Sequence, residues 1–322
     1  MSSNFFDIRG IELLELCPTG IDRERWAEFR SAMEKAKQLQ AQESGPIQID
    51  LELNGSCNMQ CPFCIHGYNG QTNIDLQITL DQAKRILAEA HQAGAISLKL
   101  NYINEPLIRK DLEDVIVFAR SIGYVNIYLV TNGSLLTAER QLSILKAGLT
   151  RIYISIDAAT SNTYNKQRKN GLYDKIVSNV KSLISLRNKL GLKFPLVRVS
   201  FLKNKTNIHE AIDFFDQWKS VADLVTFQTM NEIPNVNTGL TIESFKQIKP
   251  CDFPFKQLVV DHEGNILPCC KLPGRQLKIG NIDSMSIQEA WQSEKMQELR
   301  SQHSSCLSRL NPVCHSCLTN EQ

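Results

Sequence analysis

Residues 47–64 read IQIDLELNGSCNMQCPFC, a stretch that joins a strand pattern to a cluster of thiols. Its first seven residues alternate apolar and polar side chains, as a β-strand does. Cys57, Cys61 and Cys64 follow in a C-x3-C-x2-C spacing. Thiolates are the soft ligands of zinc and of iron–sulfur clusters. The stretch therefore predicts a metal-binding loop directly after a strand.

Beyond this loop the chain alternates between helical and strand patterns. Helical patterns cover residues 79–94, 107–123, 137–148, 173–191 and 207–220, and strand patterns cover 47–53, 96–101, 125–131, 151–157, 196–202 and 223–229. Six such units predict an α/β fold with a parallel sheet, either an open doubly wound sheet or a partial barrel. In both architectures the active site forms where the strands end, which is where the cysteine loop lies.

Local signals set some of the predicted boundaries. Thr79 and Gln82 fit a capping box at the start of the first helix after the loop, and Gly94 fits its end. No G-x-G-x-x-G follows the first strand, so the dinucleotide-binding version of the fold lacks its fingerprint.

The two flanks differ from this regular middle part. Residues 1–45 are rich in charged helix formers and predict a helical lead-in. From residue 235 the alternation stops. Residues 257–269 predict a hairpin that turns at 263–265, and residues 286–301 predict a single helix. Because cysteines flank both, we expect residues 235–322 to form a small unit stapled by metal.

Composition excludes several classes of protein. The 322 residues carry a formal net charge of +2, which leaves no electrostatic footprint for nucleic acid. The sequence has no apolar run of about 18 residues and no signal-peptide pattern at its N-terminus, so we expect a cytoplasmic protein without a membrane partner. In a reducing compartment, ten clustered cysteines point to metal or redox chemistry rather than to disulfides.

The cysteine loop allows two kinds of metal site. Three thiolates can hold three corners of a cubic cluster and leave the fourth iron without a protein ligand, as a catalytic centre requires. The alternative is a structural zinc site, for which His66 is the candidate fourth ligand.

With Phe63 just before its last cysteine, the motif resembles the signature of the radical S-adenosylmethionine (radical SAM) superfamily. The resemblance implies a partial (β/α)6 barrel over residues 46–234 and a 4Fe–4S cluster held by Cys57, Cys61 and Cys64. It also implies that the free iron binds SAM and that the reduced cluster cleaves it. The resulting 5′-deoxyadenosyl radical removes a hydrogen atom from a substrate C–H bond. The electron comes from an external donor of the flavodoxin or ferredoxin type.

The resemblance also implies SAM contacts at later strand ends. These are Asn104, Glu105, Asn132, Ser155, Asp157 and Arg168. The segment at 103–106 reads Ile-Asn-Glu-Pro where the family has Gly-Gly-Glu-Pro, so both glycines are absent. Four of these residues also have a structural interpretation: a turn at Asn132, helix caps at Ser155 and Asp157, and a solvated surface charge at Arg168.

A second set of cysteines lies near the C-terminus. Cys251, Cys269, Cys314 and Cys317 follow a C-x17-C-x44-C-x2-C pattern. It resembles the twitch domain, the smaller relative of the SPASM domain, which implies one auxiliary 4Fe–4S cluster. A structural zinc is the alternative. Among the remaining cysteines, Cys17 and Cys306 have no assigned role.

Cys270 directly follows a proposed ligand, so its side chain should point elsewhere. A thiol near the active site could donate a hydrogen atom to a substrate radical and so invert a stereocentre. The alternative is a small buried apolar residue.

These features resemble those of the aminocyclitol dehydrogenases, the aminoglycoside epimerases and the peptide maturases. We expect an enzyme that epimerises a sugar or aminocyclitol-type small molecule, with Cys270 as donor, or dehydrogenates it. One alternative is a maturase of a ribosomally synthesised peptide. Because residues 1–45 are too short for a leader-recognition domain, the small molecule is favoured. An alternative of another class is a zinc-bound interaction protein.

Overall fold

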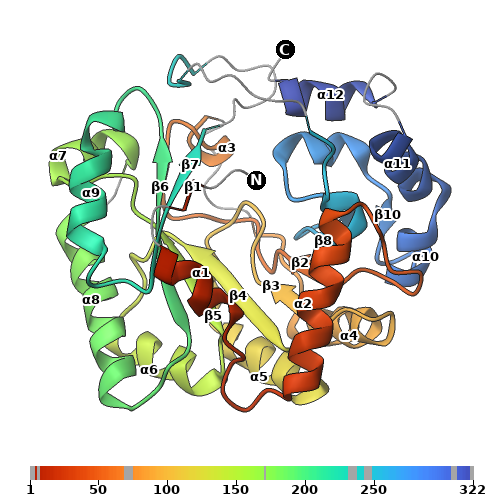
Figure 1. Cartoon of the computed structure of the whole chain (residues 1–322), viewed down its shortest axis with the longest axis horizontal. Coiled ribbons are helices and arrows are strands. Elements are labelled where there is room, and N and C mark those ends of the chain that lie inside the picture. The colour runs from red at the N-terminus through yellow and green to blue at the C-terminus, as the bar shows by residue number, and fades with distance from the viewer. Residues whose placement is uncertain are drawn as a thin grey trace.

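Six parallel strands form the centre of the fold, side by side in chain order (Figure 1). They are β2 (Gln48–Leu51), β3 (Ser97–Lys99), β4 (Asn126–Thr131), β5 (Arg151–Ser155), β6 (Leu196–Lys203) and β7 (Leu224–Thr229). The computed structural model describes residues 4–5, 8–68, 75–169, 172–230, 238–242, 249–305 and 310–319. The predicted α/β fold with a parallel sheet is confirmed.

Helices follow the strands and cover one face of the sheet. They are α4 (Leu80–Gln92), α5 (Leu112–Ile122), α6 (Ala138–Ala147), α7 (Ser161–Gln167), α8 (Tyr173–Lys189) and α9 (Ala211–Trp218), with 3-10 turns at Pro106–Ile108 and Ile208–Glu210. The predicted capping box of Thr79 and Gln82 is confirmed, and Gly94 follows the end of α4 with φ of 107°. None of the helices in the described part of the chain is long and apolar enough to cross a membrane.

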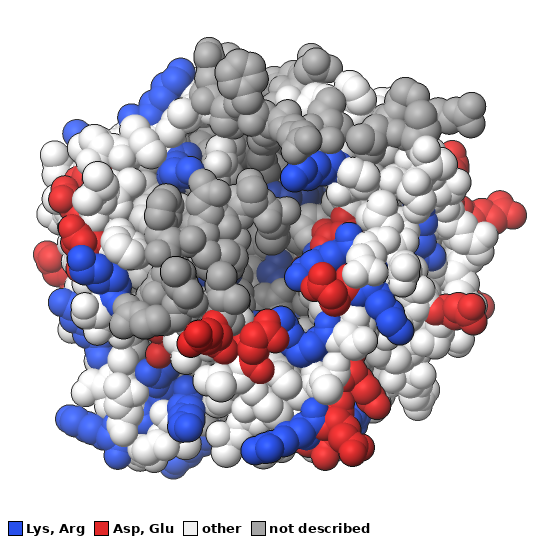
Figure 2. Space-filling model, in the orientation of Figure 1, with Lys and Arg blue, Asp and Glu red and all other residues white. Residues whose placement is uncertain are grey.

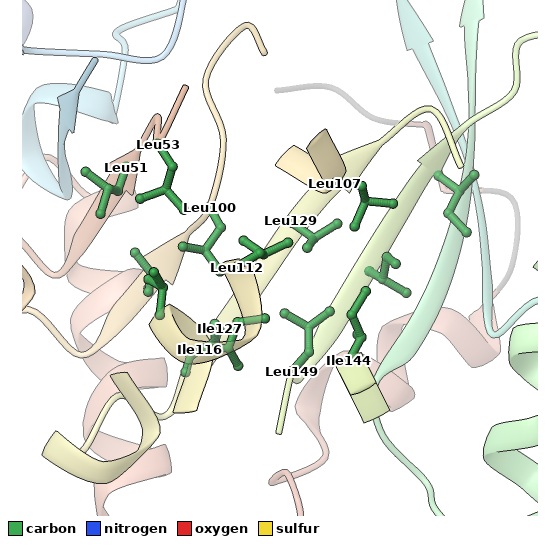
Figure 3. Close-up of a cluster of buried hydrophobic side chains, with 14 of the residues drawn as sticks. Leu51, Leu53, Leu100, Leu107, Leu112, Ile116, Ile127, Leu129, Ile144 and Leu149 are labelled. Carbon is green, nitrogen blue, oxygen red and sulfur yellow. The ribbon is translucent and has the colours of Figure 1, made fainter. Parts of the chain in front are cut away.

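The core lies between the sheet and these helices (Figure 3). Alternate strand residues such as Leu51, Leu100 and Leu129 are fully buried there against Leu112 and Ile116 of α5. Because side chains alternate along a strand, the residues between them point to the opposite face of the sheet. We call that opposite face the inner face.

Elements from the N-terminal flank lie beside the strand β7 and at the end of the sheet where the strands begin. They are β1 (Asn4–Phe5), which pairs antiparallel with β7, α1 (Ile8–Glu15) and α2 (Arg23–Lys37). Trp26 and Phe29 of α2 pack against Ile47 and Val125, which directly precede β2 and β4. The opposite end, where the strands finish, carries the cysteine loop.

The C-terminal segment extends the same sheet. It contains β8 (Gln257–Val260), β9 (Asn265–Leu267), β10 (Gly280–Asn281), α10 (Ile287–Gln292), α11 (Glu294–Ser305) and α12 (Pro312–Thr319), with 3-10 turns at Phe253–Phe255 and Leu272–Leu277. The predicted hairpin is confirmed, because β8 and β9 pair antiparallel. β8 also pairs parallel with β2, so the sheet runs without interruption from the barrel strands into this segment.

The prediction of one helix over residues 286–301 is wrong. Ser293 separates α10 from α11 with an extended ψ of 151°. Its hydroxyl donates to the carbonyl of Ala290 at 2.8 Å and accepts from the amide of Met296 at 3.4 Å. Serine competes for backbone groups in this way, so it ends one helix and begins the next.

Candidate active site

The cysteine loop leaves β2 and ends in the short helix α3 (Ile65–Tyr68). Tight backbone bonds fold it, including one from the amide of Cys64 to the carbonyl of Cys61 at 3.0 Å. A Cβ on Gly67 would lie 2.0 Å from that carbonyl oxygen, so only glycine fits. Asn58 anchors the loop to the end of β4, because it donates to Ser134 Oγ at 2.9 Å and accepts from Asn132 Nδ2 at 2.8 Å.

The three thiols of this loop suit a metal centre. Burial raises the pKa of Cys57 to about 12, and the neighbouring charges of Cys61 and Cys64 contribute to that rise. Burial also raises the pKa of Cys61, to about 11. Such thiols ionise when a metal supplies positive charge.

The zinc alternative requires a fourth ligand close to these thiols. His66 is buried on α3. Within the described ranges, no three Cys, His, Asp or Glu side chains are drawn together closely enough for a single ion. Three thiols on one short loop are the soft ligands that iron–sulfur clusters take, so the donor set fits such a cluster.

Glu105 ties three parts of the site together. Its carboxylate accepts from Thr131 Oγ1 at 2.6 Å and from the amide of Asn132 at 2.8 Å, both at the end of β4. Its own amide donates to the carbonyl of Ser56 in the cysteine loop at 2.9 Å. Burial raises the pKa of Glu105, and these donors oppose that rise. The geometry makes Glu105 a residue that positions two loops.

Asn104 leads to two residues that the sequence analysis missed. Its side chain donates to Asn54 Oδ1 at 2.8 Å, and its amide donates to Glu52 Oε1 at 3.2 Å. Glu52 also contacts His262, whose Nδ1 lies 2.7 Å from Oε2. The sequence did offer one signal for Glu52, because it is a carboxylate inside a predicted strand. In the fold the Glu52 side chain is only 1% exposed.

Asp157 and Arg168 form a buried ion pair beside the cysteine loop. Asp157 follows β5 with φ of 64°, and its Oδ2 accepts from Nε and Nη2 of Arg168 at 3.0 and 2.5 Å. Nη1 of Arg168 lies 4.0 Å from Sγ of Cys61. The structural interpretation of Arg168 as a solvated charge is wrong, because the residue is 8% exposed. Ser155 is half-buried at the end of β5.

The four C-terminal cysteines line one apolar cavity of about 40 Å³. Cys251 precedes the turn at 253–255, Cys269 follows β9, and Cys314 and Cys317 lie on α12. Burial raises the pKa of Cys251 to about 12 and that of Cys314 to about 11. Four thiols around one cavity fit a metal centre whose ligands all come from protein.

Cys270 lies outside the lining of that cavity. It packs instead against Tyr102 and residues of β8 and β9. Its thiol is near enough to influence the ionisation of Lys99 and Tyr128, which point to the inner face. Of these two adjacent cysteines, Cys269 therefore lines the C-terminal cavity and Cys270 lies beside the inner face.

Cys17 lies apart from both sites. Cys17 is half-buried near α2, and its thiol donates to the carbonyl of Ile21 at 3.6 Å. Cys306 lies outside the described residues.

Two family models match the chain. The radical SAM superfamily matches residues 51–197, and an iron-sulfur cluster-binding (SPASM) domain matches residues 251–318. The first match contains the cysteine loop and the second contains the four-cysteine cavity.

Curated relatives match between half and two thirds of the chain. A probable GTP 3′,8-cyclase of Saccharolobus solfataricus is 29% identical over 168 residues, which are 52% of this chain and 51% of the relative. An AdoMet-dependent heme synthase of Methanosarcina barkeri is 27% identical over 66% of this chain and 57% of the relative. The chain thus spans about half the length of these relatives.

Solved structures share the fold over most of the chain. SuiB of Streptococcus suis bound to the precursor peptide SuiA has a TM-score of 0.61 and 17% identity, and the match covers 88% of this chain and 74% of SuiB. BtrN in complex with AdoMet and 2-DOIA has a TM-score of 0.52 and 17% identity, over 84% of this chain and 92% of BtrN.

Proposed function

Because the chain belongs to the radical SAM superfamily and is a radical SAM enzyme, we propose that it epimerises or dehydrogenates a sugar or aminocyclitol-type small molecule. Its cofactors are SAM and 4Fe–4S clusters, one that binds SAM and one auxiliary. When bound and reduced, these cofactors supply a 5′-deoxyadenosyl radical that removes a hydrogen atom from the substrate. The rest of the reaction depends on side chains of this chain.

Specific residues would hold the cofactors. Cys57, Cys61 and Cys64 are the proposed ligands of the SAM-binding cluster. The guanidinium of Arg168 lies beside Cys61 and suits the SAM carboxylate, although its pairing with Asp157 occupies Nε and Nη2. Asn104, Glu105, Asn132 and Ser155 would shape the rest of the SAM site. The four cysteines of the C-terminal cavity are the proposed ligands of the auxiliary cluster.

The single observation that supports epimerisation is the placement of Cys270. Cys269 lines the C-terminal cavity, whereas the thiol of Cys270 lies near Lys99 and Tyr128 on the inner face. From there Cys270 would give its hydrogen atom to the substrate radical. The sulfur would be left as a thiyl radical, and one electron from the external reductant and one proton from water would restore the thiol.

Dehydrogenation is the other outcome of the same substrate radical. Without a hydrogen donor, the radical would lose one electron to the auxiliary cluster and one proton to a nearby base. Cys269, a proposed ligand of that cluster, directly precedes Cys270 in the sequence.

A peptide substrate is the second candidate. SuiB was solved with a precursor peptide, and anSMEcpe, with a TM-score of 0.59, was solved with AdoMet and a peptide. Both share the fold of this chain at low identity. A substrate isolated from a strain that lacks the gene would distinguish a peptide from a small molecule by mass.

The class of enzyme is tested by metal content and SAM cleavage. Anaerobically reconstituted protein should bind about eight iron atoms per chain, the content of two four-iron clusters. It should form 5′-deoxyadenosine on reduction, and Cys57→Ala should abolish this activity. A colourless protein that binds zinc in both cysteine sites would contradict the proposal.

The role of Cys270 is tested in deuterated water with substrate from the same deletion strain. Wild-type protein should give an inverted product that carries one deuterium atom. Cys270→Ala should still form 5′-deoxyadenosine but no inverted, deuterated product. If that product persists, Cys270 is not the donor, and a product two hydrogen atoms lighter would indicate dehydrogenation.

A further inference from the structure

The inner face of the sheet is polar and charged, in contrast to the apolar face under the helices. Asp50, Lys99, Tyr128, Tyr153 and Arg198 point to it from β2, β3, β4, β5 and β6. Figure 2, in the orientation of Figure 1, shows the molecule hollowed near its centre, with basic side chains on the wall of the hollow. A charged wall of this kind requires each charge to have a partner.

Most charges around this wall have one. Lys99 Nζ lies 3.1 Å from Asp50 Oδ2, so these two charges neutralise each other. Glu52 accepts from three backbone amides and contacts the ring of His262. Asp157 is held by Arg168. Each of these carboxylates near the inner face therefore already has a hydrogen-bonding or charged partner.

Arg198 is the exception. No hydrogen bond or ion pair joins its guanidinium to any residue in the described ranges, and its Nε is buried without a partner. Its Cζ lies 3.4 Å from the centre of the Tyr153 ring, which is a stacking contact and leaves the edge of the guanidinium plane unused. A half-buried arginine without an acceptor loses hydration without compensation.

Arg151 adds to the positive charge at the start of β5. It donates to the carbonyl of Leu14 at 3.1 Å and lies over the ring of Trp26. Neither contact is a carboxylate. Two guanidinium groups and one neutralised ion pair therefore leave this part of the wall with excess positive charge.

We propose that Arg198 binds an anionic group of the substrate, a carboxylate or a phosphate, on the inner face. The inference rests on the proposed function, and it adds the charge and the orientation of the substrate. A guanidinium presents two parallel N–H donors that match both anions, which is the contact that Arg198 lacks.

The position of Arg198 along its strand separates it from the proposed SAM site. Arg198 and Leu202 lie on the same face of β6, four residues or roughly 13 Å apart at about 3.3 Å per residue. The amide of Leu202 donates to Asp157 Oδ1 at 2.7 Å, beside the proposed SAM site. The anion would thus bind deep in the barrel while the reacting carbon lies near the strand ends.

Binding of charged sugars to the anaerobic holoenzyme tests this proposal by calorimetry. The probes are glucuronate for the carboxylate, glucose 6-phosphate for the phosphate and glucose as the neutral control. We expect one charged sugar to bind more tightly than glucose, and which one binds identifies the anion. Arg198→Met should weaken that binding at least about tenfold, the loss of one charge-assisted pair.

Two further variants keep the result interpretable. Arg198→Lys keeps the charge but not the fork, so its binding should fall between those of wild type and Arg198→Met. Arg85→Met removes an exposed arginine of α4 and should bind as wild type does. If Arg198→Met fails to fold, as judged by circular dichroism, the lysine variant decides.

Two outcomes would overturn the proposal: neither charged sugar binds better than glucose, or the Arg198 variants bind as wild type does. SAM cleavage is measured separately on the same samples. If the wild-type protein does not cleave SAM, the proposed function is wrong. The calorimetric binding data would still test the anion site independently.

Discussion

Nδ1 of His262 lies 2.7 Å from Oε2 of Glu52, and this contact joins the turn between β8 and β9 to the end of β2. Oε1 of Glu52 accepts from the amides of Ile103 and Asn104 at 2.8 and 3.2 Å. One carboxylate therefore fixes the loop that holds Asn104 and, at the same time, the hairpin that leads to Cys269. Together with the pairing of β2 and β8, it links the two segments that carry the proposed cluster ligands.

Replacement of His262 should reveal this link through the pH dependence of stability. Burial lowers the pKa of His262, but the hydrogen bond and charge of Glu52 outweigh it, so the net pKa is raised. The protonated pair then contributes stability below pH ~6.5 and loses it as the pH rises through the raised pKa. His262→Gln should unfold about 1–3 kcal/mol more easily than wild type at pH 6, with a smaller difference at pH 9. Urea unfolding at both pH values measures it, and a difference that grows with pH would contradict the assigned partner.

The sequence predicted the barrel strands because each combines strand periodicity with a helix that follows. The run at 223–229, for example, forms β7 in its predicted place. The pairing of β8 with β2 was not predictable, because a hairpin pattern does not reveal which strand it lies beside. The break at Ser293 was missed because the helical pattern continues on both sides of one capping serine.

Arg168→Gln should lower both stability and SAM cleavage. It leaves the buried carboxylate of Asp157 without its cation, which costs about 3–5 kcal/mol. The double variant Arg168→Gln, Asp157→Asn removes both charges and should recover stability but not cleavage. Thermal unfolding and 5′-deoxyadenosine formation measure the two effects. If the double variant also recovers cleavage, Arg168 has no role beyond neutralising Asp157.

The candidate site was only partly predictable from the sequence. The spacing of the cysteines is a recognisable pattern in the sequence, so both sets of metal ligands could be predicted without a structure. Glu52, Lys99 and Arg198 could not, because they lie in strands as single charged residues. Their meaning depends on cross-strand neighbours, such as the contact of Arg198 with Tyr153, that only the register of the sheet defines.

Tyr153 should report on the charge of the inner face. Burial opposes its ionisation, but the guanidinium groups of Arg151 and Arg198 outweigh burial and lower the pKa of its hydroxyl. Removing the positive charge in Arg198→Met should therefore raise the pKa of Tyr153. Tyrosinate absorbance during a pH titration measures this shift, with Tyr153→Phe to identify the signal. An unchanged titration in Arg198→Met would show that Arg198 does not act on this tyrosine.

Gly274→Ala should empty the auxiliary cavity of its metal without affecting the first cluster. A Cβ at Gly274 would lie 2.4 Å from Sγ of Cys269, so the thiol must move away from the other three. Iron content should fall from about eight to about four atoms per chain, the content of a single four-iron cluster. SAM cleavage should persist, because Cys57, Cys61 and Cys64 lie on another loop. Ser301→Ala is the control, because it changes an exposed residue of α11 in the same segment. Full iron content in Gly274→Ala would mean that Cys269 is not a ligand, and loss of all iron would mean that the two sites do not assemble independently.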